Sequence, residues 1–168
     1  CDIAQWGNNT DRSGPVEVEG HGEYPPKESL WNVLKKFQVT YRYPDGVRMI
    51  YKTDMPYVDF EGSEGKVRAN FGKGGIKTIP ESVLQAEIPS DGVRFPLMHE
   101  KDDFIRAVKT RGETLEDAEV GHRTASVCHL GHIAIQLGQK LKWDPEAERF
   151  IDNDAANEFI DRPIHAPV

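Results

Sequence analysis

One stretch of the chain decides the fold: residues 37–51, which read FQVTYRYPDGVRMIY. Large apolar side chains occupy positions 37, 39, 41 and 43 and then 47, 49 and 51, with polar residues between most of them. Alternation with a period of two is the pattern of a β-strand with one buried face. Pro44-Asp45-Gly46 joins the two halves and offers a glycine for a left-handed turn. The stretch therefore predicts a β-hairpin with one buried face and one face of Gln, Thr, Arg and Lys.

Short strands are also expected on both sides of this hairpin. Their ranges are 16–19, 58–61, 66–71, 76–79 and 140–143. The three that follow the hairpin are separated by glycine-rich gaps of four residues, 62–65 and 72–75. Parallel strands need crossovers of about a dozen residues or more, so the sheet is predicted to be mostly antiparallel.

Helical periodicity is clearest in the second half of the chain, at 99–110 and 115–138. The sequence also predicts shorter helical segments at 2–6, 28–35 and 153–161, loops at 20–26 and 89–96, and an extended tail at 162–168. Most of the strands precede the long helices, which is typical of the α+β class. The predicted fold is one large, mostly antiparallel open sheet with helices packed on one face.

Composition narrows the classes of partner. The 168 residues include 21 Lys and Arg against 28 Asp and Glu, which gives a net charge of −7, and 38% of the residues are hydrophobic. An acidic chain with no basic block is a poor ligand for nucleic acid or for an anionic membrane. No apolar run approaches the ~18 residues of a membrane span. We therefore expect neither nucleic acid nor membrane as a partner, and a cytoplasmic location, with any export signal lying upstream of Cys1.

Self-contained catalytic and metal motifs are missing from the sequence. GxGxxG and GxxxxGK[ST] are absent, and the segment 72–75 is interpreted as a hairpin turn. His122 and His129 lie seven residues apart on the expected long helix, a rise of about 10 Å that is too long for one metal ion. His129 and His132 are closer, but HExxH is absent and no carboxylate lies within their turn. The pair Asp102-Asp103 suits a helix N-terminus, so the residues alone predict no metal site and no complete catalytic set.

Six segments occur in an order and spacing that carry a family resemblance. They are CDIAQWG at 1–7, FEGSEG at 60–65, Phe104 with Ala107-Val108, GHRTASVCHL at 121–130, LKWDP at 141–145 and DAAN at 154–157. Together they span almost the whole chain and resemble the C-terminal domain of the Gfo/Idh/MocA oxidoreductases. The fold that this resemblance implies, a large open antiparallel sheet, agrees with the fold predicted above.

The resemblance implies a parent enzyme in two domains. An N-terminal Rossmann domain, expected upstream of Cys1, would bind NAD or NADP, and residues 1–168 would form the C-terminal domain for substrate binding and oligomerisation. The implied reaction is hydride transfer between NAD(P) and a sugar, a cyclitol or a related polyol or carbonyl substrate. Two alternatives stay open: an NAD-dependent, redox-assisted glycosidase of the same fold, and a noncatalytic binding or assembly module.

The site residues follow from the same resemblance. Family members carry a catalytic Lys in the nucleotide domain and a D-x-x-x-H-x-x-D pattern on the helix that enters the C-terminal domain. Only the last Asp is present here, as Asp2, so the catalytic His and Lys are expected upstream of Cys1. The chain by itself is then expected to bind no NAD(P) and to be inactive. Asp2 is the predicted substrate-binding residue, and a solvent-facing carboxylate is the alternative for it. His122 and Arg123 are the predicted cofactor-binding residues, and a structural helix–helix contact is the alternative for them.

The open face of the sheet is expected to form a homo-oligomer interface. An exposed apolar sheet face favours pairing between copies, and the Tyr and Phe side chains of residues 37–51 are the candidates for it. A small sugar or polyol and a second copy of the chain are thus the expected partners.

Overall fold

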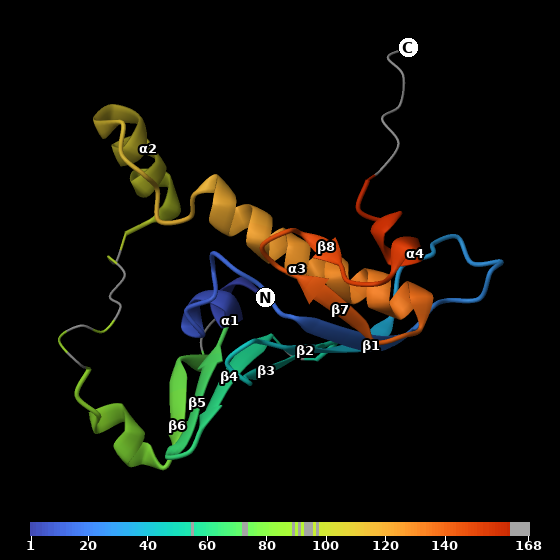
Figure 1. Ribbon diagram of the computed structural model, residues 1–168. Helices are drawn as coiled ribbons and strands as arrows, with labels where there is room; N and C mark the ends of the chain where they lie inside the picture. Colours follow the sequence, from blue (N-terminus) through green and yellow to red (C-terminus); the bar gives the residue numbers. More distant parts are fainter. Residues whose placement is uncertain are drawn as a thin grey trace. The chain divides into compact units, whose positions relative to one another are not determined.

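The chain forms two compact units in a computed structural model, which describes residues 1–54, 56–71, 74–88, 90, 92, 96 and 98–161. The first unit comprises Cys1–Thr53 and Ala118–Val168, and the second comprises Asp54–Asp117. The elements of the first unit (Figure 1) are α1 (Asp2–Gly7), β1 (Glu17–Glu23), β2 (Lys36–Arg42), β3 (Arg48–Lys52), α3 (Ala118–Leu137), β7 (Leu141–Asp144), β8 (Arg149–Phe150) and α4 (Asp154–Asn157). Those of the second are β4 (Tyr57–Gly62), β5 (Gly65–Asn70), β6 (Ile76–Ile79), the 3-10 helix η2 (Glu81–Gln85) and α2 (Glu100–Thr110).

The predicted hairpin is present in the first unit. β2 pairs antiparallel with β3, and the register sets Val39 opposite Tyr51 and Tyr41 opposite Met49. β1 lies on the other side of β2, and β7 and β8 complete a sheet of order β3-β2-β1-β7-β8. Each of these pairings is antiparallel, so the antiparallel sheet and the α+β class are confirmed.

The hydrophobic core of this unit lies between the sheet and α3. α3 contacts β1 and β2 and lies along one face of the sheet (Figure 1). Burying a large apolar side chain stabilises a fold by about 1.5–3 kcal/mol, so this layer supplies most of the unit's stability. The core residues are Val18, Val39, Tyr41, Tyr43, Val127, Leu130, Ile133, Ala134, Ile135, Leu141, Trp143, Phe150 and Ala156.

β1 is longer than the predicted strand because two glycines let neighbouring side chains approach it. The strand runs to Glu23 through residues that the sequence predicts as a loop. A Cβ atom on Gly20 would lie 2.9 Å from Cγ1 of Ile135, and one on Gly22 would lie 2.7 Å from Cδ2 of Leu34. Glycine inside a strand marks such a close approach. The predicted loop at 20–26 is therefore wrong as far as residue 23.

Other predicted boundaries shift as well. Residues 28–35, predicted as helical turns, hold no helix and lead into β2. The helix predicted at 115–138 begins at Ala118, and the one predicted at 153–161 ends at Asn157. α1 and α2 agree with their predictions to within one residue. β8 and η2 have no predicted counterpart, because such short elements leave no periodicity in the sequence.

The second unit carries a separate antiparallel sheet of order β4-β5-β6. Its strands lie within one residue of the ranges predicted for them. The strands of the described chain thus form two sheets, where the sequence predicts one, because alternation fixes the faces of a strand and not the sheet that it joins. The predicted turn at 72–75 and loop at 89–96 lie partly, and the tail at 162–168 wholly, outside the described residues.

Two carboxylates organise the second unit. Asp59 on β4 accepts hydrogen bonds from Nε and a terminal nitrogen of Arg68, both at 2.6 Å, and pairs with Lys66 at 2.6 Å. The hydrogen bonds from Arg68, reinforced by Lys66, lower the pKa of the Asp59 carboxyl from 3.8 to about 2. Asp103 on α2 accepts a hydrogen bond from the backbone N–H of Leu115 at 2.7 Å, and that bond lowers its pKa. Asp103 therefore links α2 to the segment that follows this helix.

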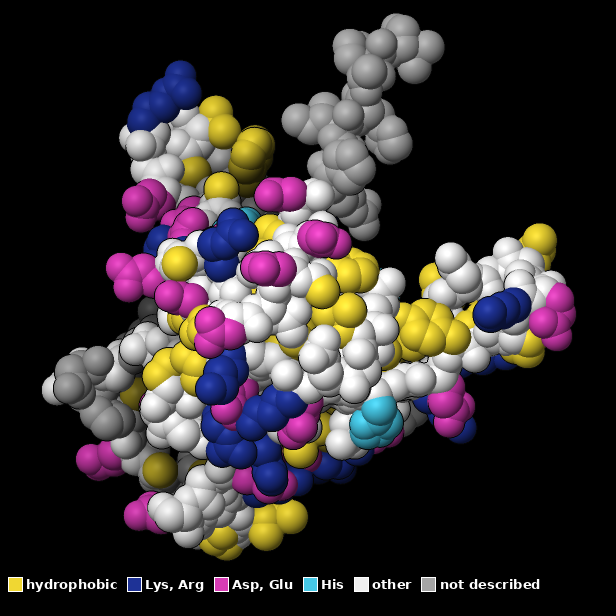
Figure 2. Space-filling model, turned by 45° about the vertical axis from the view of Figure 1, so that its right-hand side comes forward, with side chains coloured by type: hydrophobic (Ala, Val, Ile, Leu, Met, Phe, Trp, Pro, Cys, Tyr) yellow, Lys and Arg dark blue, Asp and Glu magenta, His cyan; other side chains and the backbone are white. Residues whose placement is uncertain are grey.

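The sheet face that points away from α3 is polar. Tyr41 and Tyr43 lie on the opposite face, where they are 0% and 3% exposed in the core. The prediction that the hairpin tyrosines line a dimer interface is therefore wrong for these two residues, since both side chains are buried in the core. Figure 2 shows Lys and Arg side chains gathered with Asp and Glu side chains among them. The open face of the first three strands presents Glu17, Glu19, His21, Gln38, Thr40, Arg42, Arg48, Ile50 and Lys52.

Candidate functional site

The structure places the three predicted site residues near one end of α3. Asp2 is the first residue of α1, and His122 and Arg123 lie in the first two turns of α3. The hydroxyl of Thr124 donates a hydrogen bond to Oδ1 of Asp2 at 3.3 Å. This bond places Asp2 beside Thr124, the residue that follows Arg123 on α3, although Asp2 and Thr124 are 122 positions apart in the sequence.

A buried glutamine holds α1 in place. Gln5 is 0% exposed, and its side-chain nitrogen donates to the backbone oxygens of Thr10 at 3.1 Å and Ser13 at 3.4 Å. The hydroxyls of Thr10 and Tyr43 donate to its side-chain oxygen. Burial raises the pKa of the Tyr43 hydroxyl, which therefore stays protonated and keeps donating. Since a buried amide is costly without partners, this satisfied network fixes the helix on which Asp2 lies.

Arg123 connects α3 to the turn between β7 and β8. Its Nε pairs with Glu119 at 2.7 Å, one turn earlier on α3. Its terminal nitrogen donates to the carbonyl of Pro145 at 2.6 Å and pairs with Glu148 at 2.8 Å. Only 17% of the side chain is exposed. These contacts link α3 to the turn between β7 and β8, and the predicted contact of Arg123 with a cofactor stays a prediction.

Glu148 is the site residue that sequence reasoning missed. Its two carboxylate oxygens lie 3.0 and 2.8 Å from Nε2 of His122, so the His122 ring and Arg123 share this acceptor. Glu148 also has a φ of 51°, in the left-handed region that few residues other than glycine adopt. A glutamate in a turn after Asp144-Pro145 gives no signal of such contacts, because they span 26 positions of sequence.

The charge of the cluster favours hydrogen-bond donors over anions. Its three carboxylates, Asp2, Glu119 and Glu148, and its one guanidinium, Arg123, leave a net charge of −2 when His122 is neutral. Carboxylates and a neutral imidazole nitrogen accept hydrogen bonds. The arrangement therefore suits a ligand with hydroxyl or amide groups, whereas a phosphate would meet more negative than positive charge.

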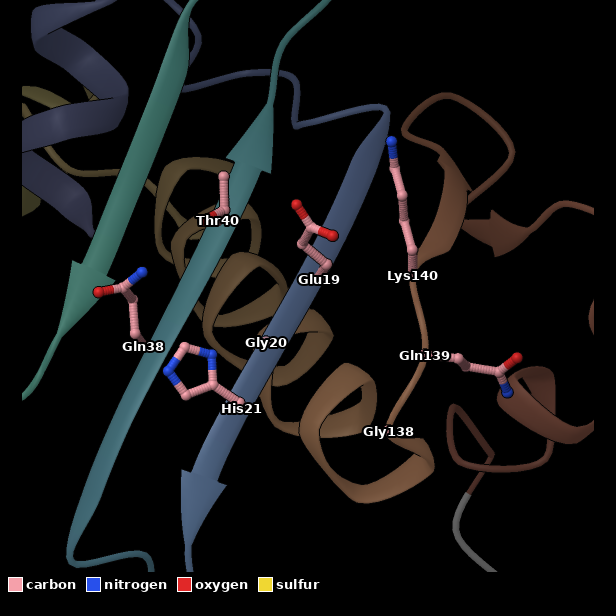
Figure 3. A pocket seen from close by; sticks show the side chains of 8 residues that line it. All are labelled: Glu19, Gly20, His21, Gln38, Thr40, Gly138, Gln139 and Lys140. Carbon is pink, nitrogen blue, oxygen red and sulfur yellow. The ribbon is translucent and has the colours of Figure 1, made fainter.

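A polar hollow of about 290 Å³ lies elsewhere, beside β1, β2 and the residues after α3. Figure 3 shows the side chains of Glu19, His21, Gln38 and Thr40 on the sheet strands, with Lys140 and Gln139 beside them. Sequence reasoning singled out none of these residues. Among the described residues no Phe, Tyr or Trp lines the hollow, so it lacks the flat apolar surface on which sugars stack.

Metal and membrane features can be stated for the described part of the chain. Among its residues, no three or more His, Cys, Asp or Glu side chains gather in a way that could hold a metal ion. Nε2 of His132 lies 3.4 Å from the hydroxyl of Tyr24, a polar partner from the loop after β1. No helix there is long and apolar enough to cross a membrane.

Comparison with known families identifies the chain. Residues 1–168 match the family model described as oxidoreductase family, C-terminal alpha/beta domain. The chain belongs to the Gfo/Idh/MocA oxidoreductase family. This membership confirms the resemblance carried by the six segments.

Solved structures share the fold of this Gfo/Idh/MocA domain. An aldose-aldose oxidoreductase from Caulobacter crescentus, complexed with glycerol, aligns with a TM-score of 0.60 at 14% identity, over 84% of this chain and 44% of its own. An oxidoreductase from Agrobacterium radiobacter, in complex with NAD+, L-tartaric acid and magnesium, aligns with a TM-score of 0.54 at 13% identity, over 84% of this chain and 46% of its own. An NAD-binding protein from Listeria innocua aligns with a TM-score of 0.50 at 12% identity, over 83% and 47%.

The chain thus spans less than half the length of each of these structures. At such low identity the likeness concerns the fold. No curated protein matches the chain in a sequence comparison.

Proposed function

We propose that this chain is the substrate-binding domain of a cytoplasmic NAD(P)-dependent oxidoreductase. The reaction is hydride transfer between the nicotinamide and a carbon of a sugar, a cyclitol or a related polyol or carbonyl compound. One observation carries the proposal: in a chain that matches an oxidoreductase C-terminal domain, Asp2 joins the start of α3, where His122 and Arg123 lie. The cofactors in the Agrobacterium complex and in the name of the Listeria protein support NAD(P) as the hydride carrier.

Within this proposal, the residues of the cluster have separate roles. Asp2 accepts one hydrogen bond from Thr124, and a carboxylate has about four acceptor positions, so it can also accept a bond from a substrate hydroxyl. His122, with half of its side chain exposed, faces the cofactor, and Arg123 fixes the backbone beside it. NAD(P), when bound, supplies the site that takes up or releases the hydride. The nucleotide-binding domain and the catalytic His and Lys come from outside residues 1–168.

An assay of the full-length parent tests this function. Purified parent is mixed with NAD+ or NADP+ and a panel of aldoses, cyclitols and linear polyols, and NADH or NADPH is followed by absorbance. We expect formation of reduced cofactor with at least one of these substrates. Cleavage of an aryl glycoside with catalytic NAD+ and no net NADH would assign the redox-assisted glycosidase instead. Inactivity in both assays, together with failure to bind either cofactor, would leave a noncatalytic module.

We also infer that copies of the chain associate through the open face of the five-stranded sheet. β1 presents Glu17 and Glu19 on this face, and β3 presents Arg48 and Lys52. When two such faces meet about a two-fold axis along β2, the acidic strand of one copy opposes the basic strand of the other. Sedimentation of the full-length parent should show a dimer or larger assembly that Arg48→Glu weakens, and a monomeric wild type would contradict the inference.

A further inference from the structure

The turn between β7 and β8 holds Glu148 in an unfavourable backbone conformation. Its φ of 51° lies in the left-handed region, which costs a residue with a side chain about 1–2 kcal/mol. The rest of the turn is well bonded, since the Asp144 carboxylate accepts the N–H groups of Glu146 and Ala147, each at 2.9 Å. Strained backbone conformations persist where the surrounding contacts hold them, and they are more common at functional sites.

The Glu148 side chain meets α3 at His122 and Arg123. Its oxygens lie 3.0 and 2.8 Å from Nε2 of His122 and 2.8 Å from a terminal nitrogen of Arg123. A neutral imidazole carries one proton, and a bond to a carboxylate puts that proton on Nε2, which leaves Nδ1 as an acceptor. The His122 side chain is 50% exposed, and no hydrogen bond from Nδ1 to another described residue is present.

We propose that Glu148 is a positioning residue, which orients His122 so that Nδ1 accepts a hydrogen bond from a neutral O–H or N–H donor of the bound ligand. Charge supports a neutral donor over an anion, because Glu119, Glu148 and the Pro145 carbonyl already occupy the Arg123 guanidinium. The identity of the ligand rests on the proposed function. The donor is then a hydroxyl of the substrate or the carboxamide of the nicotinamide, which share this chemistry.

Glu148→Gly separates positioning from stability. It removes the carboxylate, and glycine adopts a positive φ without a steric cost, so the melting temperature should hold or rise. Glu146→Ala is the matched control, because it removes an exposed carboxylate from the same turn. In 1H–15N NMR of residues 1–168, the Nε2–H signal of His122 should be visible in the wild type and in Glu146→Ala and lost to solvent exchange in Glu148→Gly. Persistence of that signal in Glu148→Gly would overturn the positioning role.

Kinetics of the full-length parent identify the ligand. We expect Glu148→Gly to raise one KM about tenfold, the effect of one lost hydrogen bond, while kcat changes less than about twofold and Glu146→Ala changes neither. A raised KM for the polyol assigns the donor to the substrate, and a raised KM for NAD(P) assigns it to the nicotinamide. Two unchanged KM values would overturn the contact with a ligand. A wild-type parent without oxidoreductase activity would refute the proposed function, whereas the NMR result would still decide the role of Glu148.

Discussion

At the scale of single residues, Asp59 links the stability of the second unit to pH. Hydrogen bonds from Arg68 and then Lys66 lower the pKa of its carboxyl from 3.8 to about 2. A carboxyl whose pKa is lower in the folded state stabilises the fold above the unfolded value and loses that stabilisation as the pH falls through the folded value. Because only 17% of the Asp59 side chain is exposed, we expect a loss of about 1–2 kcal/mol across this window.

Urea unfolding followed by NMR signals of β4 and β5 measures this loss. The urea midpoint of the wild type should decrease as the pH is lowered from 3.8 to about 2. Asp59→Asn should be less stable than the wild type at neutral pH, and its urea midpoint should lack this part of the pH dependence. Glu64→Gln serves as the control, since it removes an exposed carboxylate from the turn between β4 and β5. Parallel pH profiles for wild type and Asp59→Asn would contradict the assignment.

Single residues also show how far sequence reasoning reaches into the site. The proximity of His122 and Arg123 needs only the helix that contains them. The contacts of Glu148 with that helix depend on the turn between β7 and β8, and a pattern of residue types does not encode such a turn. Gln5 is a similar case, because its burial follows from Tyr43 and Thr10, which approach it only in the folded unit.

At the scale of elements, Gly131 determines how closely α3 packs on β2. A Cβ atom at this position would run into the Tyr41 hydroxyl and lie 3.1 Å from both methyl groups of Val39. That hydroxyl donates to the carbonyl of Val127 on α3 at 2.9 Å, so the clash would also disturb a buried hydrogen bond. We expect Gly131→Ala to destabilise the first unit by about 1–3 kcal/mol, as overpacked cores do.

Gly121 provides the matched control on the same helix. Among the described residues, no atom beyond the neighbouring residues and the helix backbone lies within 4 Å of a Cβ atom there, so Gly121→Ala should be neutral or stabilise the helix by up to about 1 kcal/mol. Thermal unfolding followed by far-UV circular dichroism compares the two variants. Equal melting temperatures for both would show that α3 can move away from the sheet without cost.

Elements with regular alternation were predictable, and elements governed by packing were not. The hairpin of β2 and β3 follows from residues 37–51, because each buried position repeats with a period of two. β1 breaks that pattern at Gly20 and Gly22, where the side chains of Ile135 and Leu34 occupy the space that a Cβ atom would need. The 28–35 segment has helical composition, yet it serves as the approach to β2.

At the scale of the whole molecule, we expect that residues 1–168 do not bind the cofactor by themselves. The sequence has no GxGxxG segment, and the Arg123 guanidinium is bonded to protein acceptors. Isothermal titration of the purified chain with NADH and NADPH should show no binding, whereas the full-length parent should bind one of them. Micromolar binding to residues 1–168 would contradict the proposal that a separate domain of the parent binds the cofactor.

The sequence was informative about the whole molecule mainly through its family. The six quoted segments led to the family that the match over residues 1–168 confirms. Physical patterns in the sequence could not reveal the reaction, because the residues of the candidate cluster become neighbours only when α1 and the turn after β7 meet α3.

In the proposed function Asp2 belongs to the substrate site of the parent enzyme, and the variant Asp2→Asn tests this role. Asp2→Asn keeps an oxygen for the hydrogen bond from Thr124 but removes the charge that would hold a substrate hydroxyl. Since a hydrogen bond to a charged group contributes about 1.5–3 kcal/mol, kcat/KM of the full-length parent should fall about 10- to 100-fold. The melting temperature should stay nearly unchanged, and Asp102→Asn on α2 should leave both values unaltered. An unchanged kcat/KM for Asp2→Asn would place Asp2 outside the substrate site and contradict the proposed role of this residue.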